Sequence, residues 1–126
     1  MLKDIRLIAP QKCSADEKVI DVAKKLKEST QRYIYVVDEN DWPIGIISTT
    51  DINNKVVAEG KDANALTAKD IMSQPIEVYD INDDEVNVYK EMVENKRFGC
   101  AVVENKKLIG VVSLKDLITH ITSEGK

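Results

Sequence analysis

The feature that most constrains the fold is an internal repeat. The segment Gly45–Ile52 (GIISTTDI) returns 65 residues later as Gly110–Leu117 (GVVSLKDL), with glycine, serine and aspartate in the same register. Upstream, Lys3–Ile5 matches Lys69–Ile71 at an offset of 66 residues. The two offsets differ by one residue, and we assign this difference to the turn between the two strands of the hairpin. Turns tolerate changes in length better than strands do. The chain therefore consists of two similar halves, and we expect both to fold in the same way.

The hydrophobic pattern of the first half predicts a helix, a hairpin and a second helix. Apolar residues recur at helical spacing over residues 19–26, and charged residues occupy the other face. Residues 33–37 and 44–47 are rich in β-branched and aromatic side chains and flank a turn-rich segment, which predicts a strand-turn-strand hairpin. A second helix is expected over residues 50–59, and Gly60 ends it.

The second half predicts the same elements in the same order. A helical stripe is formed by Val86, Tyr89, Met92 and Val93. Residues 98–103 and 108–112 predict the second hairpin, and residues 114–121 the last helix.

These patterns predict an α+β fold of two repeats, each with the order β-α-β-β-α and a short leading strand. The repeats span residues 1–60 and 67–126, and residues 61–66 form a polar linker. A chain of about 60 residues buries too little apolar surface to form a stable domain alone. We therefore expect the two repeats to pack sheet to sheet about a pseudo-twofold axis, as one compact module.

Charge and hydropathy exclude several classes of partner. The 126 residues carry a formal net charge of −4, so the chain has no long-range attraction for nucleic acid or anionic lipid. The longest apolar run, residues 33–37, is far shorter than the roughly 20 residues of a membrane helix. The N-terminal residues also lack the apolar core of a signal peptide. We expect a cytoplasmic protein without nucleic-acid or membrane partners.

Cysteine and histidine are too few to build a metal site. Cys13 and Cys100 stand far apart and outside any CxxC spacing, so we expect two reduced thiols. His120 is the only histidine, and its polar surroundings at residues 119–126 predict a solvated side chain and not part of a Cys-His or Ser-His dyad. No metal and no required cofactor are expected.

The repeated segments at 45–51 and 110–116, here called the Ser-Asp motifs, are the strongest candidates for a binding site. Each consists of glycine, two apolar residues, serine, two further residues and aspartate. A serine at the start of a helix lies beside free backbone N–H groups, which stabilise an anion such as phosphate. A carboxylate one turn later can accept hydrogen bonds from the two hydroxyls of a ribose.

The same spacing has a simpler interpretation. Ser48 with Asp51, and Ser113 with Asp116, also fit capping boxes, which only start helices. A capping box does not require the preceding glycine, whereas close approach of a ligand to the backbone does. The repetition of that glycine favours ligand binding, and both interpretations stay open.

The sequence resembles a tandem pair of cystathionine-β-synthase-type (CBS) domains, a Bateman module, from about Lys3 to Ile121. The resemblance rests on Lys69–Ser73 (KDIMS), on Val36–Asp38 and Val102–Glu104, and on both Ser-Asp motifs. It implies a regulatory module that binds AMP, ADP, ATP or S-adenosylmethionine in two clefts between the sheets and often dimerises.

Transferred by position, the resemblance implies two sets of ligand-binding residues. The first set comprises Ser113, Lys115 and Asp116, completed by Ile8, Pro10, Arg32, Tyr33 and Ile34 around the base. The second set comprises Ser48 and Asp51, completed by Ser73, Ile76, Arg97, Phe98 and Gly99. Tyr33 stands where the family commonly has a small residue, so it either stacks on adenine or fills its space.

We therefore predict a stand-alone regulatory module, not an enzyme, that binds an adenine nucleotide and signals through a homodimer or an effector protein. The dimer is expected from an apolar stripe on the last helix: Leu114, Leu117, Ile118 and Ile121. One alternative is binding of S-adenosylmethionine, and another is a ligand-free interaction module. A third alternative is a nucleotide hydrolase with a metal at Asp83 and Asp84, residues that also fit the first turn of a helix.

Overall fold

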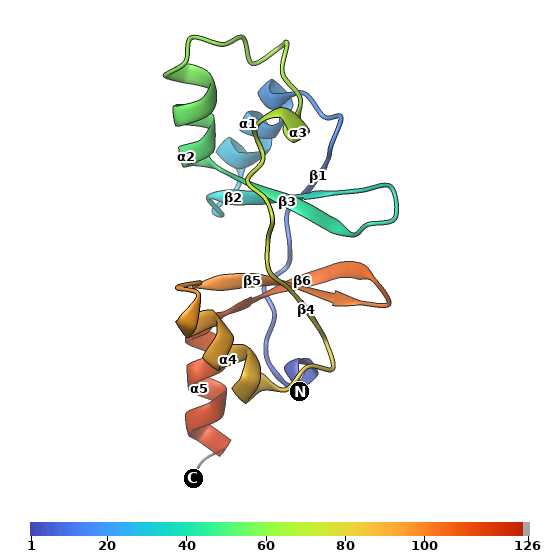
Figure 1. The fold of residues 1–126 in the computed structure, drawn as a ribbon, viewed down its shortest axis with the longest axis vertical. Helices are drawn as coiled ribbons and strands as arrows, with labels where there is room; N and C mark the ends of the chain where they lie inside the picture. The colour runs from blue at the N-terminus through green and yellow to red at the C-terminus, as the bar shows by residue number, and fades with distance from the viewer. Residues whose placement is uncertain (125–126) are drawn as a thin grey trace. The chain divides into compact units, whose positions relative to one another are not determined.

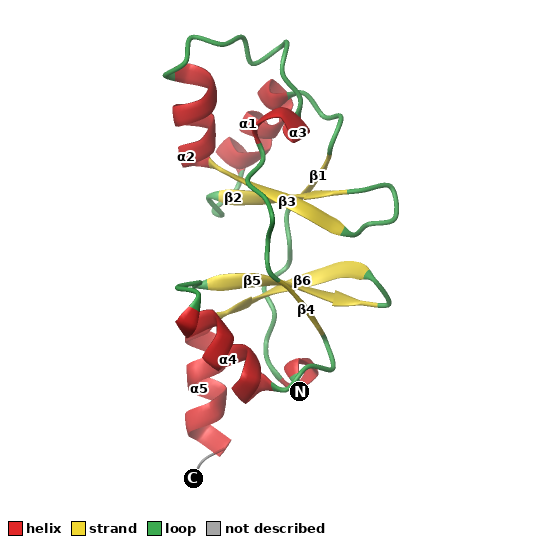
Figure 2. Ribbon diagram, viewed as in Figure 1, coloured by secondary structure: helices red, strands yellow, loops and turns green. Residues whose placement is uncertain are grey.

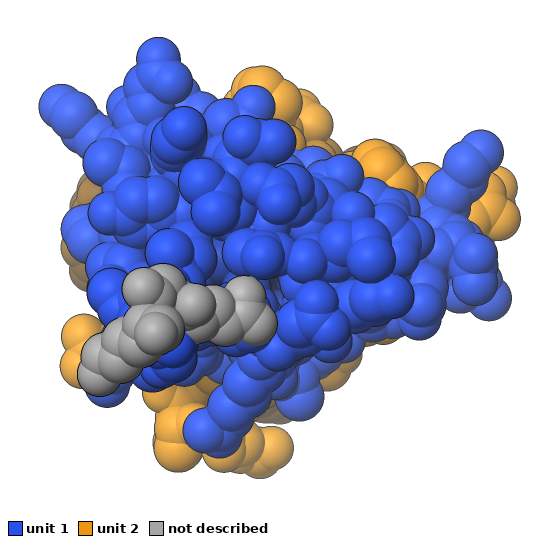
Figure 3. All heavy atoms as spheres, turned by 90° about the horizontal axis from the view of Figure 1, so that it is seen from below, with its two compact units in different colours: residues 1–10, 77–126 blue, residues 11–76 orange. Residues whose placement is uncertain are grey.

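A computed structural model describes residues 1–124 and divides the chain into two compact units. Unit 1 contains Met1–Pro10 together with the chain from Glu77 onwards, and unit 2 contains Gln11–Ile76 (Figure 3). Each unit has its own three-stranded sheet, with its longer helices on one face of that sheet (Figure 2).

Unit 2 contains most of the first repeat. Its elements are β1 (Lys12–Ser14), α1 (Val19–Glu28), β2 (Tyr33–Val37), β3 (Pro43–Ser48), α2 (Thr49–Ile52), the π-helical turn η2 (Asn53–Val57) and α3 (Ala68–Ile71) (Figure 1). The strand order is β1-β2-β3, in which β1 is parallel to β2 and β2 is antiparallel to β3.

Unit 1 repeats this topology. Its elements are the 3-10 turn η1 (Leu2–Asp4), β4 (Val78–Asp80), α4 (Glu85–Glu94), β5 (Gly99–Glu104), β6 (Lys107–Ser113) and α5 (Leu114–Glu124). The strand order is β4-β5-β6, again with one parallel and one antiparallel pairing. The prediction of an α+β fold with the order β-α-β-β-α in each repeat is confirmed.

The cores of the two units are separate clusters of aliphatic side chains. Unit 2 buries Val19, Val22, Ile34, Val36 and Ile47 completely. Unit 1 completely buries Leu2, Met92, Val102, Val112 and Leu117.

The predicted stripe on the helix of the second repeat was partly wrong. Helix α4 begins after Asp84, and this start places Val88 and Met92, four residues apart, against the sheet. Val86 and Val93 therefore face outwards, with exposed fractions of 39% and 48%. Apolar spacing alone allowed two helix faces, and the contacts of α4 select the face that includes Val88.

The compact units divide the chain at other residues than the sequence repeats do. The first ten residues pack in unit 1: Leu2 is buried there, and Ile8 pairs with Val111 of β6. In unit 2, Ser73 pairs with Ile46 of β3 in the same way. The segment predicted as a linker, 61–66, is also bonded within unit 2, since the Val19 N–H donates to the Leu66 carbonyl at 2.9 Å. Inside its own unit, each Ser-Asp motif is thus joined by a segment from the start of the other sequence repeat.

These added segments explain the glycine of each Ser-Asp motif. A Cβ atom on Gly45 would lie 2.5 Å from Sδ of Met72, and one on Gly110 would lie 2.8 Å from Cβ of Leu7. The glycine therefore makes room for a side chain of the protein itself. The sequence-based argument that this glycine admits a ligand to the backbone loses its force.

We predict that Gly110→Ala destabilises the protein more than Gly45→Ala. The obstacle at Gly110 includes Cβ of Leu7, which only a backbone movement can displace, whereas Gly45 first meets the flexible end of Met72. Overpacking of this kind costs about 1–3 kcal/mol. Thermal and denaturant unfolding measure the effect, and Gly99→Ala is the control because its nearest neighbour lies 3.5 Å away. Equal stability of the Gly110 and Gly99 variants would contradict the packing argument.

Candidate ligand site

Both Ser-Asp motifs lie where the last strand of a sheet turns into a helix. Ser48 is the last residue of β3 and precedes α2, and Ser113 is the last residue of β6 and precedes α5. The two junctions differ in the helix that they start. Helix α5 continues for 11 residues, whereas α2 has four residues and then widens into η2.

The serine and the aspartate of each motif bond to one another. Ser48 Oγ accepts a hydrogen bond from the Asp51 N–H at 3.1 Å, and Asp51 Oδ2 accepts one from the Ser48 N–H at 2.9 Å. Ser113 Oγ accepts from the Asp116 N–H at 3.0 Å and donates to Asp116 Oδ2 at 2.9 Å. The capping interpretation therefore describes the geometry of both motifs. It uses one carboxylate oxygen of each aspartate and leaves the other for further contacts.

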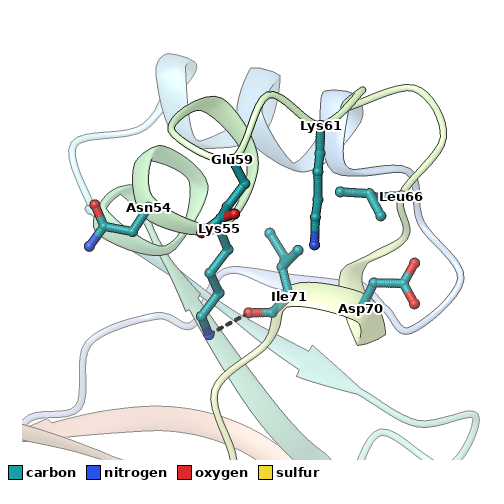
Figure 4. A pocket seen from close by; sticks show the side chains of 7 residues that line it. All are labelled: Asn54, Lys55, Glu59, Lys61, Leu66, Asp70 and Ile71. Atoms are coloured by element: carbon teal, nitrogen blue, oxygen red, sulfur yellow. Dashed lines mark hydrogen bonds between the residues drawn. The ribbon is translucent and has the colours of Figure 1, made fainter.

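The second oxygen of Asp51 is contacted by its own unit. Ser73 Oγ donates to Asp51 Oδ1 at 3.3 Å, and Lys55 Nζ forms an ion pair with the same atom at 3.3 Å. Lys55 also donates to the Ile71 carbonyl at 2.9 Å, a bond drawn in Figure 4, and to Ser73 Oγ at 3.2 Å. Lys55 thus joins η2 to the segment after α3.

The structure brings several predicted residues together within each unit. In unit 1, Gly99 pairs with Ser113, the Phe98 carbonyl accepts from the Leu114 N–H at 2.8 Å, and Ile8 pairs two residues before Ser113. Pro10 and Lys115 belong to the same unit.

In unit 2, Tyr33 pairs with Ser48, and the Arg32 carbonyl accepts from the Thr49 N–H at 3.0 Å. Ser73 contacts Asp51, and Ile76 ends the unit. Arg32, Tyr33 and Ile34 therefore lie in unit 2 while Ser113 and Asp116 lie in unit 1. Likewise Arg97, Phe98 and Gly99 lie in unit 1 while Ser48 and Asp51 lie in unit 2. The joining of these groups across the units stays a prediction.

Individual side chains differ in their availability to a ligand. Ile34 is completely buried in the core of unit 2, so its side chain is not exposed to a ligand at the surface of that unit. Tyr33 stacks edge-on against Tyr35 with ring centroids 5.9 Å apart, and burial raises the pKa of the Tyr33 hydroxyl. Arg97 Nε lies 3.6 Å from Glu77 Oε1. Phe98 is 81% exposed.

The surface of each unit contains a hollow. In unit 1, a hollow of about 360 Å³ is lined by Phe98, Ser113, Leu114, Lys115, Ile118 and Thr119. In unit 2, a hollow of about 580 Å³ is lined by Asn54, Lys55, Glu59, Lys61, Leu66, Asp70 and Ile71 (Figure 4). The first contains Ser113 and Lys115 of the predicted site, whereas the second contains Lys55, which the sequence analysis did not select.

Residues considered for catalysis or metal binding have structural partners. Asp84 caps α4 by accepting from the Asn87 N–H at 3.1 Å, and Asp83 Oδ2 accepts from the Asp80 N–H at 2.8 Å. Among residues 1–124, no cluster of three His, Cys, Asp or Glu side chains suits a metal ion. His120 lies in α5 and is half-buried, so the prediction of a solvated side chain was wrong, because His120 stands about one helical turn after the buried Leu117.

No helix in the described part of the chain is long and apolar enough to cross a membrane.

Comparison with known families decides what these motifs belong to. A family model for the CBS domain matches residues 2–58 and again residues 68–123. The chain belongs to the CBS-domain family. Its two matches coincide with the two sequence repeats, and pairs of CBS domains are in general regulatory modules that bind ligands.

Individual relatives agree with this assignment. The uncharacterized protein MK0525 of Methanopyrus kandleri is 37% identical over 107 residues, which are 83% of this chain and 54% of that protein. The chain spans about half the length of two of its curated relatives, 54% and 56%.

Two solved structures show the same fold. Staphylococcus aureus OpuCA gives a TM-score of 0.76 at 19% identity, covering 94% of this chain and 97% of that one. The hexameric CBS-CP12 protein from bloom-forming cyanobacteria gives a TM-score of 0.73 at 24% identity, covering 98% and 73% of the two chains.

The two thiols are expected to be unreactive in the folded CBS pair. Burial raises the pKa of both Cys13 and Cys100 from 9.0 to about 12. Three pKa units reduce the thiolate fraction near pH 8 about a thousandfold, and the thiolate is the nucleophile. An aromatic disulfide reagent should therefore modify both thiols quickly in denaturant and very slowly in the folded protein. Equal rates in both states would contradict the burial.

The same shifts predict a loss of stability in alkali. Above pH 9 the unfolded thiols ionise while the folded ones keep their protons, so the unfolding free energy falls as the pH rises towards 12. Denaturant titrations of the protein and of a Cys13→Ala, Cys100→Ala variant measure this term, and the variant should show the weaker alkaline decline.

Proposed function

We propose that this CBS pair binds an adenine nucleotide (AMP, ADP or ATP) and acts as a regulatory module. The observation that carries the proposal is the surroundings of Asp116. This carboxylate follows Ser113 at the start of an 11-residue helix, where N–H groups and the helix dipole favour an anion. Lys115 adds a positive charge, and the neighbouring hollow of about 360 Å³ falls within the usual size range of ligand pockets.

The proposed function requires recognition and no chemistry. Asp116 and Asp51 are placed to accept hydrogen bonds, and the buried thiols are poor nucleophiles. We therefore propose a protein without catalytic activity or a required cofactor. We place it in the cytoplasm, where thiols such as Cys13 and Cys100 remain reduced.

Two alternatives use the same fold. S-adenosylmethionine carries the same ribose hydroxyls as AMP but a sulfonium and a carboxylate in place of phosphate. Competition between it and AMP separates these ligands. A ligand-free interaction module is favoured by the capping geometry of both Ser-Asp motifs. It predicts that no adenosine compound raises the melting temperature.

We also propose that the chain forms a homodimer. Leu117, part of the predicted dimer stripe, belongs to the core of unit 1, but Ile118 is 42% exposed and lines a hollow beside the exposed Phe98. Exposed apolar side chains that cluster in this way suit contact with another protein. The hexameric CBS-CP12 protein provides one example of an oligomer with this fold.

Light scattering tests the dimer. At micromolar concentration we expect twice the chain mass, and Ile118→Glu should shift the protein towards monomer because the dimer would bury an unpaired charge. Val93→Glu, on the exposed face of α4, is the matched control and should leave the mass unchanged. A monomer with and without nucleotide would refute the proposal.

Substitution of the two aspartates tests ligand binding. If each accepts hydroxyl hydrogen bonds as an anion, Asp116→Ala should weaken AMP binding by about 10- to 150-fold. Asp51→Ala should cost less, since Lys115 favours phosphate near Asp116 and the equivalent residue beside Asp51 is Thr50. Calorimetric titration measures the affinity and thermal unfolding measures the stability.

The capping interpretation predicts a different result for the same two variants. Each should lose up to about 1 kcal/mol of stability and keep its AMP affinity. That combination would show that the Ser-Asp motifs only start helices.

A further inference from the structure

The two aspartates differ in how many of their acceptor positions the protein already uses. An ionised carboxylate offers about four positions for hydrogen-bond donors, two on each oxygen. At Asp51, Oδ2 accepts from the Ser48 N–H, and Oδ1 is contacted by both Ser73 Oγ and Lys55 Nζ. Hydrogen bonds use two of the four positions, and the Lys55 ammonium lies over a third as an ion pair, so about one position is clear of the protein's own groups, whereas the two hydroxyls of a ribose need two.

Asp116 is much less occupied. Its Oδ2 accepts from Ser113 Oγ at 2.9 Å. Within residues 1–124 no other donor contacts either oxygen of this carboxylate, so about three positions are left. Asp116 can accept a pair of hydroxyls without giving up a contact.

The difference originates in two positions of the repeat. His120 stands 65 residues after Lys55, as Asp116 stands after Asp51. Ile8 pairs with Val111 in unit 1 in the same way as Ser73 pairs with Ile46 in unit 2, so Ile8 is the equivalent of Ser73. Its aliphatic side chain stands where unit 2 has the Ser73 hydroxyl. Neither donor of unit 2 has a counterpart at Asp116 within residues 1–124.

We infer that Lys55 and Ser73 occupy Asp51 in place of a ligand, and that the open carboxylate of Asp116 makes unit 1 the principal nucleotide site. The inference rests on the proposed function and assigns Lys55 a role in specificity. For Asp51 to bind a ribose, Lys55 must leave the carboxylate while its bonds to the Ile71 carbonyl and to Ser73 hold it in place.

The test isolates the Asp51 motif in an Asp116→Ala background and uses AMP as the probe. Adding Lys55→Met, which keeps the length of the side chain and removes its charge, should raise AMP affinity by up to about fivefold, because the part-exposed ion pair no longer covers an acceptor position of Asp51. Adding Ser73→Ala frees the other position and should also raise the affinity. The dideoxy analogue of AMP, which lacks both ribose hydroxyls, should gain nothing from either change.

Lys61→Met in the same background is the matched control. Lys61 lines the same hollow as Lys55 (Figure 4) but makes no side-chain hydrogen bond or ion pair within residues 1–124, so its loss should leave AMP affinity unchanged. Circular dichroism and thermal unfolding show whether each variant is folded. If Lys55→Met does not fold, Lys55→Gln replaces it in the test.

The outcomes separate the inference from the proposed function. If the unaltered chain binds AMP and Lys55→Met leaves the affinity unchanged, the inference is wrong. A weakened affinity would instead show that Lys55 contacts the phosphate, and it also overturns the inference. If the unaltered chain binds no AMP, the proposed function fails, and the inference then survives only if Lys55→Met creates binding by itself.

Discussion

The junction between the last strand and the next helix positions the serine and the aspartate of each Ser-Asp motif in this CBS pair. At each junction the serine hydroxyl accepts a hydrogen bond from the backbone N–H of the aspartate, and the aspartate carboxylate accepts one from the serine. These bonds hold the aspartate at the end of its sheet. A segment from elsewhere in the chain packs on the glycine three residues before the serine. Capping and ligand binding are therefore compatible, because the cap uses only part of the carboxylate.

Much of the fold could be predicted because its signals are local. Periodicity of two or of about 3.6 residues located the hairpins and the longer helices, and the repeat of the Ser-Asp motif indicated two equivalent halves. The exchange of Met1–Pro10 into unit 1 could not be predicted in this way, because its pairing with Val111 joins residues about a hundred positions apart. The face of α4 was also ambiguous, since Val86 and Val88 are equally apolar.

The candidate site was only partly predictable for the same reason. The motif residues Ser48, Asp51, Ser113 and Asp116 follow a spacing that can be seen in the sequence. Lys55 was missed because a lysine on a short helix usually lies in solvent, and its role depends on the Ile71 carbonyl and on Ser73. A comparison of Lys55 with His120 at the same repeat position was the available signal, because the two halves differ there in charge.

The central claim is that Asp116 accepts the ribose of an adenine nucleotide, and residue-resolved NMR tests it most directly. A titration of the isotope-labelled chain with AMP should shift the backbone amide signals of Ser113, Lys115 and Asp116 in a saturable way. Smaller shifts are expected at Ser48 and Asp51, whose carboxylate Lys55 occupies. Saturable shifts confined to other residues, or no shifts at all, would contradict the account.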